Sequence, residues 1–276
     1  MEGTVGEATR EVLDAIIFVA TSGCTWNQLP PGFGLSGVTA FRRITEWTEA
    51  RVWAKLHRLV LVELGARGEL ESPDTAQGVD TAYEQCPRRL PGGGRGRTRP
   101  AGRGRAGLVT VRDRLRQRPG PQRGQLTGPN PTDRGKKGSK IHLIVGLPLS
   151  VGISAANLHA QALIPLVRGI PPIRSRRGPR RRRPGKLHGD KGYDYRHLRR
   201  LLASRGIRHR LARKGIESSR RPGRHRWVVE RTISRLSGCR RLHRRYERKP
   251  EHFLAFTAIA ATPVATADLP SEMTPY

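Results

Sequence analysis

The first apolar pattern of the chain has the spacing of a helix. It begins after Thr9 and ends near Gly23, and its apolar positions are Val12, Ala15, Ile16 and Val19. The segment LPPGFG interrupts the pattern. A second helical pattern then runs to Gly65 and Gly68 through Phe41, Ile44, Trp47, Val52, Leu56, Leu59 and Leu64. We therefore expect residues 1–70 to form a small helical region with basic outer positions.

Strand-like and helical patterns alternate in the second half of the chain. The segments GSKIHLIV and GLPLSVGIS predict an antiparallel hairpin, with alternation at Ile141, Leu143 and Val145. A helical segment with apolar positions from Leu158 to Val167, a short strand at Lys186, a helix, a strand and a last helix follow. This order predicts an α/β fold with one mixed sheet over residues 126–260, followed by a tail over residues 261–276.

Residues 71–125 separate these two regions and have a different composition. They are rich in Arg, Gly and Pro and contain few of the apolar residues that a packed core needs. We expect this segment to lack regular structure. A basic linker that binds nucleic acid is the alternative.

The net charge narrows the range of partners. The 276 residues include 53 Lys and Arg against 22 Asp and Glu, which gives a formal net charge of +31. Such a surface favours a polyanion, because neutralising phosphates releases their counterions. A membrane surface is the weaker alternative, since the chain has no apolar run of about 18 residues.

The cysteines and the first residues bear on the cellular compartment. The three cysteines, Cys24, Cys86 and Cys239, show no paired spacing, so neither a zinc site nor a disulfide framework is predicted. The first residues have no basic segment that leads into an apolar core, and they therefore do not predict a signal peptide. We expect a protein of the reducing cytoplasm.

Two carboxylates stand out in this basic chain. Asp190 follows a short strand, and catalytic groups of open α/β sheets gather at such strand ends. Glu230 lies in a helical segment, where pairing with an arginine one turn away is the simpler interpretation. Together with a third carboxylate from a central strand, these residues would hold two divalent cations about 3.5–4 Å apart. Oxygen ligands favour Mg²⁺ or Mn²⁺.

Several segments carry a family resemblance. HGDKGYDYRHLRRLL, followed by GRHRWVVERTISRLSGCRRLHRRYERKPEHFLAF, resembles the DDE transposases of bacterial insertion sequences, in the insertion-sequence-five and insertion-sequence-four families. SGCTWNQLPPGFG, LTGPNPTDRGKKGSKIHLI and ARKGIESS also match, in the order found in the family. The resemblance covers most of residues 9–70 and 125–260.

The resemblance implies an RNase-H-like domain in which Asp190 is the second and Glu230 the third catalytic, metal-binding carboxylate. It implies two Mg²⁺ or Mn²⁺ ions in an intact member, a helical N-terminal region that contacts transposon-end DNA, and a homo-oligomer on double-stranded DNA in the bacterial nucleoid, with no membrane partner. Asp194 is then expected to cap the following helix or to support the site. With the basic charge, the resemblance predicts DNA contacts from Lys136, Lys137, Lys140, Lys191, Arg226, Arg231, Arg240 and Arg241.

The pattern departs from the family where the first carboxylate belongs, shortly before LTGPNP. Asp80 lies too far upstream, and Asp113 stands in a segment without strand character, so both are weak candidates. One permitted back-translation of residues 107–124, advanced by one nucleotide, gives a strand-like segment with an Asp whose codon straddles Arg114 and Leu115. We therefore hypothesise a frameshifted or degenerate transposase copy with impaired DNA cleavage and strand transfer.

Two alternatives differ from this enzyme interpretation. The first is a DNA-binding transposase remnant without catalytic activity. The second is a basic RNA-associated protein, which would explain the charge but not Asp190 together with Glu230.

Overall fold

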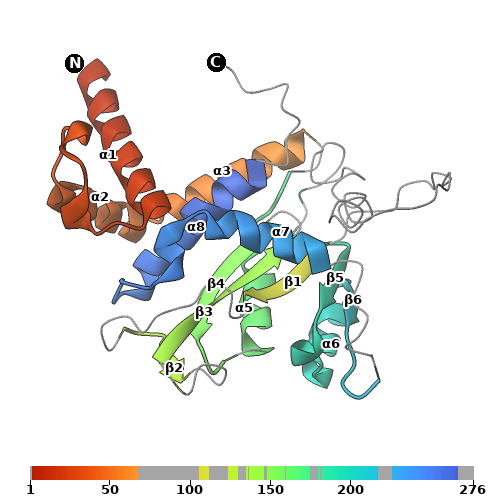
Figure 1. Ribbon diagram of the computed structural model, residues 1–276. Coiled ribbons are helices and arrows are strands. Elements are labelled where there is room, and N and C mark those ends of the chain that lie inside the picture. The colour runs from red at the N-terminus through yellow and green to blue at the C-terminus, as the bar shows by residue number, and fades with distance from the viewer. Residues whose placement is uncertain are drawn as a thin grey trace, which may run out of the picture.

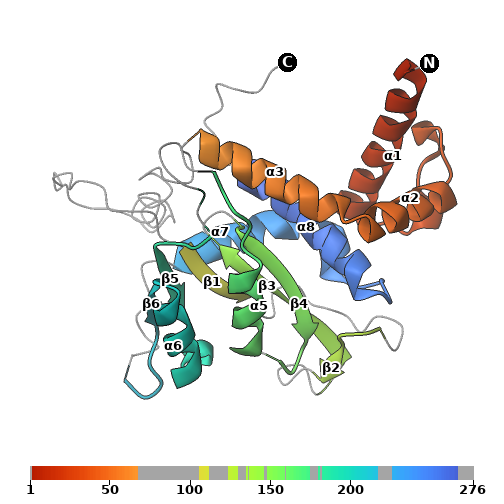
Figure 2. The same cartoon turned by 180° about the vertical axis from the view of Figure 1, so that it is seen from behind.

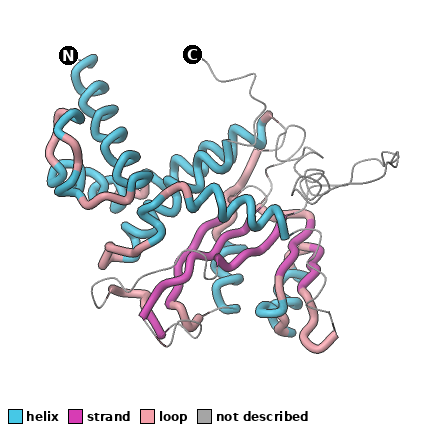
Figure 3. Tube along the Cα trace, viewed as in Figure 1, coloured by secondary structure: helices cyan, strands magenta, loops and turns pink. Residues whose placement is uncertain are grey.

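The computed structural model describes ten stretches of the chain. They are residues 2–67, 106–111, 124–129, 135, 137–145, 148–158, 160–174, 180, 182–216 and 226–266, with the backbone alone for residues 2–7, 106–111, 226–230 and 263–266. Figure 1 shows N-terminal helices beside a mixed α/β region, as the sequence predicts. Figure 3 separates the helical layers from the strands between them.

The N-terminal region contains three helices and two short 3₁₀ turns. These are α1 (Glu2–Ser22), η1 (Trp26–Gln28), η2 (Pro31–Phe33), α2 (Gly37–Glu49) and α3 (Val52–Ala66). Helix α1 begins earlier than the expected start after Thr9. The second apolar pattern is divided between α2 and α3, because Arg51 adopts the left-handed conformation with φ 55°. Phe41 and Leu59, which the pattern placed on helix faces, are exposed at 44% and 66%.

The mixed sheet has the strand order β2-β3-β1-β5-β6, and β4 also pairs with β3. The strands are β1 (Ala106–Val111), β2 (Gly128–Pro129), β3 (Lys137–Val145), β4 (Ser150–Ala155), β5 (Lys186–Gly189) and β6 (Arg208–Leu211). Strand β3 is antiparallel to β1, β2 and β4, whereas β5 is parallel to β1 and β6. The predicted hairpin and the predicted mixed sheet are therefore both present.

Strand β1 lies inside segment 71–125, which was expected to lack regular structure, so that expectation is wrong for residues 106–111. The six residues Ala-Gly-Leu-Val-Thr-Val pair with β3 on one side and with β5 on the other. Pairing partners that are distant in sequence therefore stabilise a strand that the local composition hid. The rest of the segment up to residue 123 lies outside the described residues.

Helices cover both faces of the sheet (Figure 1 and, from behind, Figure 2). The remaining elements are η3 (Ala160–Ala162), α5 (Leu163–Arg168), η4 (Lys191–Tyr193), α6 (Arg196–Ser204), α7 (Arg226–Ser237), η5 (Arg240–His243) and α8 (Pro250–Thr266). On one face, Leu143 and Val145 share a core with Leu236 of α7 and Phe256 of α8. On the other face, Ile144 and Leu187 pack with residues of α5 and α6.

The N-terminal helices pack on the α/β region. Ile16 of α1 and Ile44 of α2 belong to the same core cluster as Leu143 of β3. Helix α3 contacts α8, and its Leu61 is buried in the other cluster with Ile144. The buried His57 of α3 places its Nε2 2.7 Å from the backbone oxygen of Pro148, in the turn between β3 and β4. Helices α1, α2 and α3 are therefore continuous with the core of the sheet.

Candidate active site

Asp190 stands immediately after the last residue of β5. Its backbone is extended, with φ −75° and ψ 177°, and its carboxylate accepts a hydrogen bond from the backbone N–H of Gly192 at 2.9 Å. This bond caps the 3₁₀ turn η4, whose last residue, Tyr193, is fully buried. The exposed Asp190 thus lies at the carboxyl end of β5, and the buried Tyr193, three residues later, fixes the turn that follows it.

The pairing register shows which face of the sheet Asp190 occupies. Position 107 pairs with Val145 of β3 and with His188 of β5, so these three positions share one face. Val145 belongs to the core that includes Leu236, and this is therefore the α7 face. Because alternate residues of a strand share a face and the extended backbone continues to residue 190, Asp190 follows His188 on the α7 face.

Helix α7 carries Glu230 over this face of the sheet. The helix contacts β1 and β3, and Ile233 and Leu236 pack against the core beneath it. Only the backbone of Glu230 is described, which places the residue in the first half of α7. Asp190 and the helix that carries Glu230 thus lie on the same side of the sheet. The approach of their carboxylates stays a prediction.

Strand β1, which pairs with β5, contains no acidic residue. Extending the parallel register of β1 and β5 by two residues places position 109 level with Asp190, and position 109 is a valine. Position 109 also pairs with Leu143, which puts it on the α7 face. The weak candidates Asp80 and Asp113 lie outside the described residues.

Within the described residues, the set of acidic donors is incomplete for a pair of divalent cations. Two ions held by carboxylates need a third acidic residue beside Asp190 and Glu230, and valine occupies the level position on β1. Among the described side chains, no group of three or more His, Cys, Asp or Glu residues gathers to hold a metal ion.

Two of the residues predicted to contact DNA have buried side chains. Arg241 is 3% exposed, and Lys140 is 6% exposed with its Nζ 3.4 Å from the backbone oxygen of Leu158. Burial removes both from contact with a DNA backbone, so their assignment to DNA binding is corrected. Lys137 and Arg240 are exposed, and Lys191 and Arg231 are partly exposed. Lys136 and the side chain of Arg226 lie outside the described residues.

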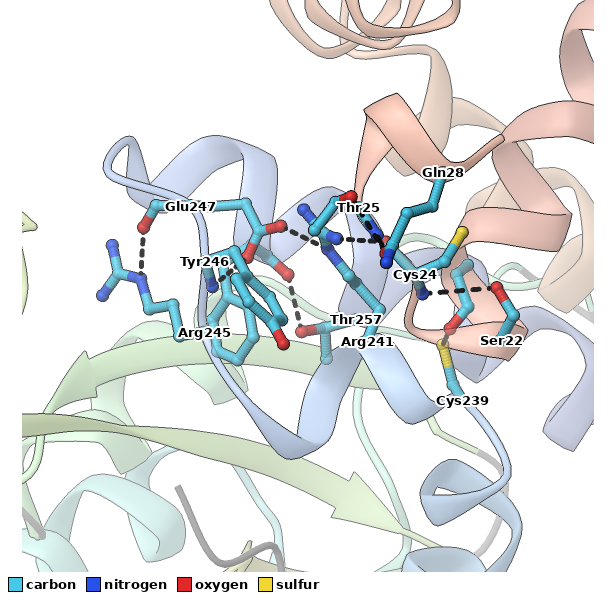
Figure 4. Close-up of polar contacts among 12 residues, drawn as sticks. Ser22, Cys24, Thr25, Gln28, Cys239, Arg241, Arg245, Tyr246, Glu247 and Thr257 are labelled. Carbon is cyan, nitrogen blue, oxygen red and sulfur yellow. Dashed lines mark hydrogen bonds and ion pairs between the residues drawn. The ribbon is translucent and has the colours of Figure 1, made fainter. Parts of the chain in front are cut away.

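The buried Arg241 joins the N-terminal region to the α/β region (Figure 4). Its Nε donates to Glu247 at 2.8 Å, and the two side chains are only 4% and 5% exposed. Its Nη1 donates to the backbone oxygen of Cys24 at 2.6 Å. The guanidinium also lies over the ring of Tyr246, 4.6 Å from the centroid, and near Trp26 and Phe256. This arrangement holds the loop before η1 against η5.

Arg245 is a second buried arginine in the basic run 240–248, and it also holds parts of the fold together. The Nη1 of Arg245 donates to the hydroxyl of Ser139 in β3, and its Nε donates to the backbone oxygen of Glu247 at 2.9 Å. Its guanidinium lies 5.5 Å from the ring centroid of Phe253. The basic run 240–248 is therefore partly structural. The sequence pattern did not predict that arginines of this run are buried. The acidic Glu247 within the run was the one indication of a buried ion pair.

Asp194, expected to cap a helix or support the site, connects the turn after β5 to the loop after β6. Its carboxylate accepts a hydrogen bond from the backbone N–H of Lys214 at 2.8 Å and two from the guanidinium of Arg199, at 2.7 and 3.0 Å. The N-cap position of α6 is occupied by Tyr195 instead. The bond from Lys214, followed by those from Arg199, lowers the pKa of the Asp194 carboxyl below its ordinary value.

We expect Asp194→Asn to destabilise the protein at neutral pH and to have little effect in acid. A carboxyl whose pKa is lowered by folding stabilises the folded state above its ordinary pKa of 3.8 and loses that contribution as the pH falls through the lowered value. The difference in melting temperature between parent and variant should therefore shrink as the pH is lowered from 7 to below the ordinary pKa of the carboxyl. Asp14→Asn, on the exposed side of α1, is the control. A difference that stays constant with pH would contradict the prediction.

The family described as "Transposase DDE domain" matches residues 113–262, which is more than half of the chain. The chain belongs to this transposase family. The family described as "Putative transposase of IS4/5 family" matches residues 3–57, the N-terminal helical region. Asp190 and Glu230 both lie within the match to the transposase DDE domain.

Two curated relatives come from Burkholderia cepacia. The "Putative transposase for insertion sequence element IS402" is 43% identical over 134 residues, which are 47% of this chain and 64% of the relative. The "Insertion element IS402 uncharacterized 16.2 kDa protein" is 39% identical over 70 residues, which are 25% of this chain and 48% of the relative. The transposase-family chain thus spans less than two thirds of either relative. Within its described part, no helix is both long and apolar enough to cross a membrane.

Proposed function

We propose that this protein is an insertion-sequence transposase that binds double-stranded DNA and whose strand-cleaving activity is impaired. The match to the transposase DDE domain supports the transposase function, and a relative described as a transposase for an insertion sequence element agrees with it. The observation that carries the proposal is the position of Asp190 at the end of β5, on the face of the sheet that α7 covers. The net charge of +31 supports DNA as the partner.

The proposal includes an RNase-H-like arrangement of the catalytic region. A central sheet with an antiparallel hairpin followed by parallel strands, and a helix with Glu230 across one face, is consistent with it. In this arrangement Asp190 and Glu230 would be the carboxylates that act on DNA. The protein would work as a homo-oligomer on DNA, in the cytoplasm and on the nucleoid.

Impairment is proposed because the first carboxylate of the family pattern is absent from β1. In transposases of this kind, divalent ions such as Mg²⁺ or Mn²⁺ supply the chemistry of DNA cleavage. With valine at position 109, level with Asp190, strand β1 supplies no carboxylate to such a site. A transposase remnant that binds DNA without cutting it is the second candidate function, and the same valine favours it.

Two assays on the full chain test this proposal. A duplex that carries insertion-sequence ends should bind with an affinity that falls steeply with added salt. In the presence of Mg²⁺ or Mn²⁺, nicking of this duplex should not exceed the level seen with Asp190→Asn, which keeps the shape of the side chain and removes its charge. Metal-dependent nicking that disappears in Asp190→Asn would overturn the impairment. Failure to bind DNA at low salt would overturn the proposal as a whole.

A frameshift is the proposed origin of the missing carboxylate. One permitted back-translation of residues 107–124, advanced by one nucleotide, gives a strand-like segment before LTGPNP, in which the codon for Asp straddles Arg114 and Leu115. The nucleotide sequence across codons 70–126 tests this origin. If no single-nucleotide offset restores a continuous family-like segment there, the Arg/Gly/Pro-rich stretch is an insertion instead.

A further inference from the structure

The paired strands β5 and β6 place basic residues directly opposite one another. Lys186 of β5 pairs with Arg208 of β6, and His188 pairs with Arg210. Arg208 and Arg210 are exposed, and Lys186 and His188 are half-buried. Neighbouring strands lie about 4.8 Å apart, so each pair brings two basic side chains close together. We call these four residues the β5–β6 basic ridge.

The ridge faces the side of the sheet on which Asp190 stands. The residues that alternate with it, Leu187 and Leu211, are buried in the core formed with α5 and α6, on the opposite face. The ridge therefore shares the α7 face, and its β5 members lead along the strand toward Asp190. At about 3.3 Å per residue, Lys186 lies roughly 13 Å from Asp190 along the strand, and His188 lies nearer to it.

Among the described strands, β6 stands at the edge of the sheet, so none of them lies beside the outer side of the ridge. A polyanion bound there would bring its phosphates close to the exposed Arg208 and Arg210, with release of counterions. The arrangement thus favours a negatively charged partner.

The loop after β6 extends the ridge with further positive charge. Arg213 and Lys214 are exposed there, and the bond from the Lys214 N–H to Asp194 fixes the backbone of this loop. The Nζ of Lys214 lies 4.6 Å from the ring centroid of Tyr195. Asp194 therefore holds a second basic segment beside the end of β6.

We infer that the β5–β6 basic ridge binds the phosphate backbone of duplex DNA and directs one strand toward Asp190. The inference rests on the proposed function for the identity of the polyanion and adds the surface that holds it. Charged residues on an edge strand have another known effect, since they prevent two sheets from pairing edge to edge. The two roles predict different results when the charges of β6 are removed.

The experiment compares two double variants of the full chain that lose the same charge. Arg208→Gln with Arg210→Gln removes the β6 part of the ridge. Arg196→Gln with Arg200→Gln removes two exposed arginines of α6, the helix that packs on the opposite face through Leu198 and Leu202. Binding of a short duplex is measured by mobility shift over a range of salt concentrations, and melting temperatures are recorded in parallel.

The ridge variant should bind DNA more weakly than the parent, and the slope of log affinity against log salt should become shallower by about 1 for each phosphate that the protein no longer neutralises. Its melting temperature should stay close to that of the parent, because Arg208 and Arg210 are exposed. The α6 variant should keep the slope of the parent. Equal reductions of affinity in both variants, or unchanged binding with new aggregation of the ridge variant, would overturn the inference. If the parent itself binds no DNA, the proposed function fails together with the ridge.

Discussion

Arg241→Ala should lower the free energy of unfolding by about 3–5 kcal/mol, because removing one partner of a buried ion pair leaves the other charge without compensation. In this protein the uncompensated group would be the carboxylate of Glu247, whose side chain is 5% exposed. The variant would also lose the bond to the backbone oxygen of Cys24 and the interaction with the Tyr246 ring. Urea denaturation followed by circular dichroism measures the change.

The adjacent Arg240 provides a matched control. Its side chain is exposed, and Arg240→Ala removes the same charge one position earlier, so the change should stay within about 0.5 kcal/mol. A double replacement by apolar residues, Arg241→Met with Glu247→Leu, should recover much of the stability, since a buried ion pair can be replaced by apolar packing at little net cost. Equal stability of Arg240→Ala and Arg241→Ala would contradict a structural role for Arg241.

Val109→Asp should give the protein a metal-dependent stability that the parent, under the proposed function, does not have. The β1–β5 register places position 109 level with Asp190 on the α7 face, so the new carboxylate would complete a set of acidic residues. Without metal, the variant should melt at a lower temperature than the parent, because a charged group replaces an apolar one beside Leu143. With Mn²⁺ or Mg²⁺ at about 100 times the dissociation constant, binding should return about 2.7 kcal/mol.

Thermal melts with and without metal measure this effect, and nicking of end-containing DNA is the second readout. Val111→Asp is the control, since position 111 shares the strand and the face but lies two residues beyond the level of Asp190. Combining Val109→Asp with Asp190→Asn should abolish the response to metal. If Val111→Asp responds as strongly as Val109→Asp, the register does not define the metal position.

Local sequence patterns predicted the elements whose apolar residues recur at the spacing of a helix or a strand. The hairpin of β3 and β4 followed from alternation at Ile141 and Leu143, and helix α6 is buried through Leu198 and Leu202. The whole of β3 from Ser139 onward is nevertheless buried, Ile144 included, because helices cover both faces of the sheet. Alternation alone described only one of these faces.

Strand β1 could not be predicted from composition, because its six residues lie within a long segment that is rich in Arg, Gly and Pro. Its stability comes from β3 and β5, which follow it by tens of residues. The buried role of Arg241 was hidden for the same reason. Its partners Cys24 and Trp26 come from the N-terminal region, and a count of charges does not separate a buried arginine from an exposed one.

The packing of α3 constrains how transposases of this kind can diversify. His57 contacts the backbone of Pro148, and Leu61 is buried with Ile144, so α3 is built into the wall of the sheet. Helices α1 and α2 belong to the region that the family resemblance implies contacts DNA, and they therefore cannot be exchanged between relatives as a cassette with a junction after α3. A functional chimera would have to carry its own η5 and α8 with the N-terminal helices. New end specificities should thus arise through substitutions within these helices more readily than through the shuffling of whole domains.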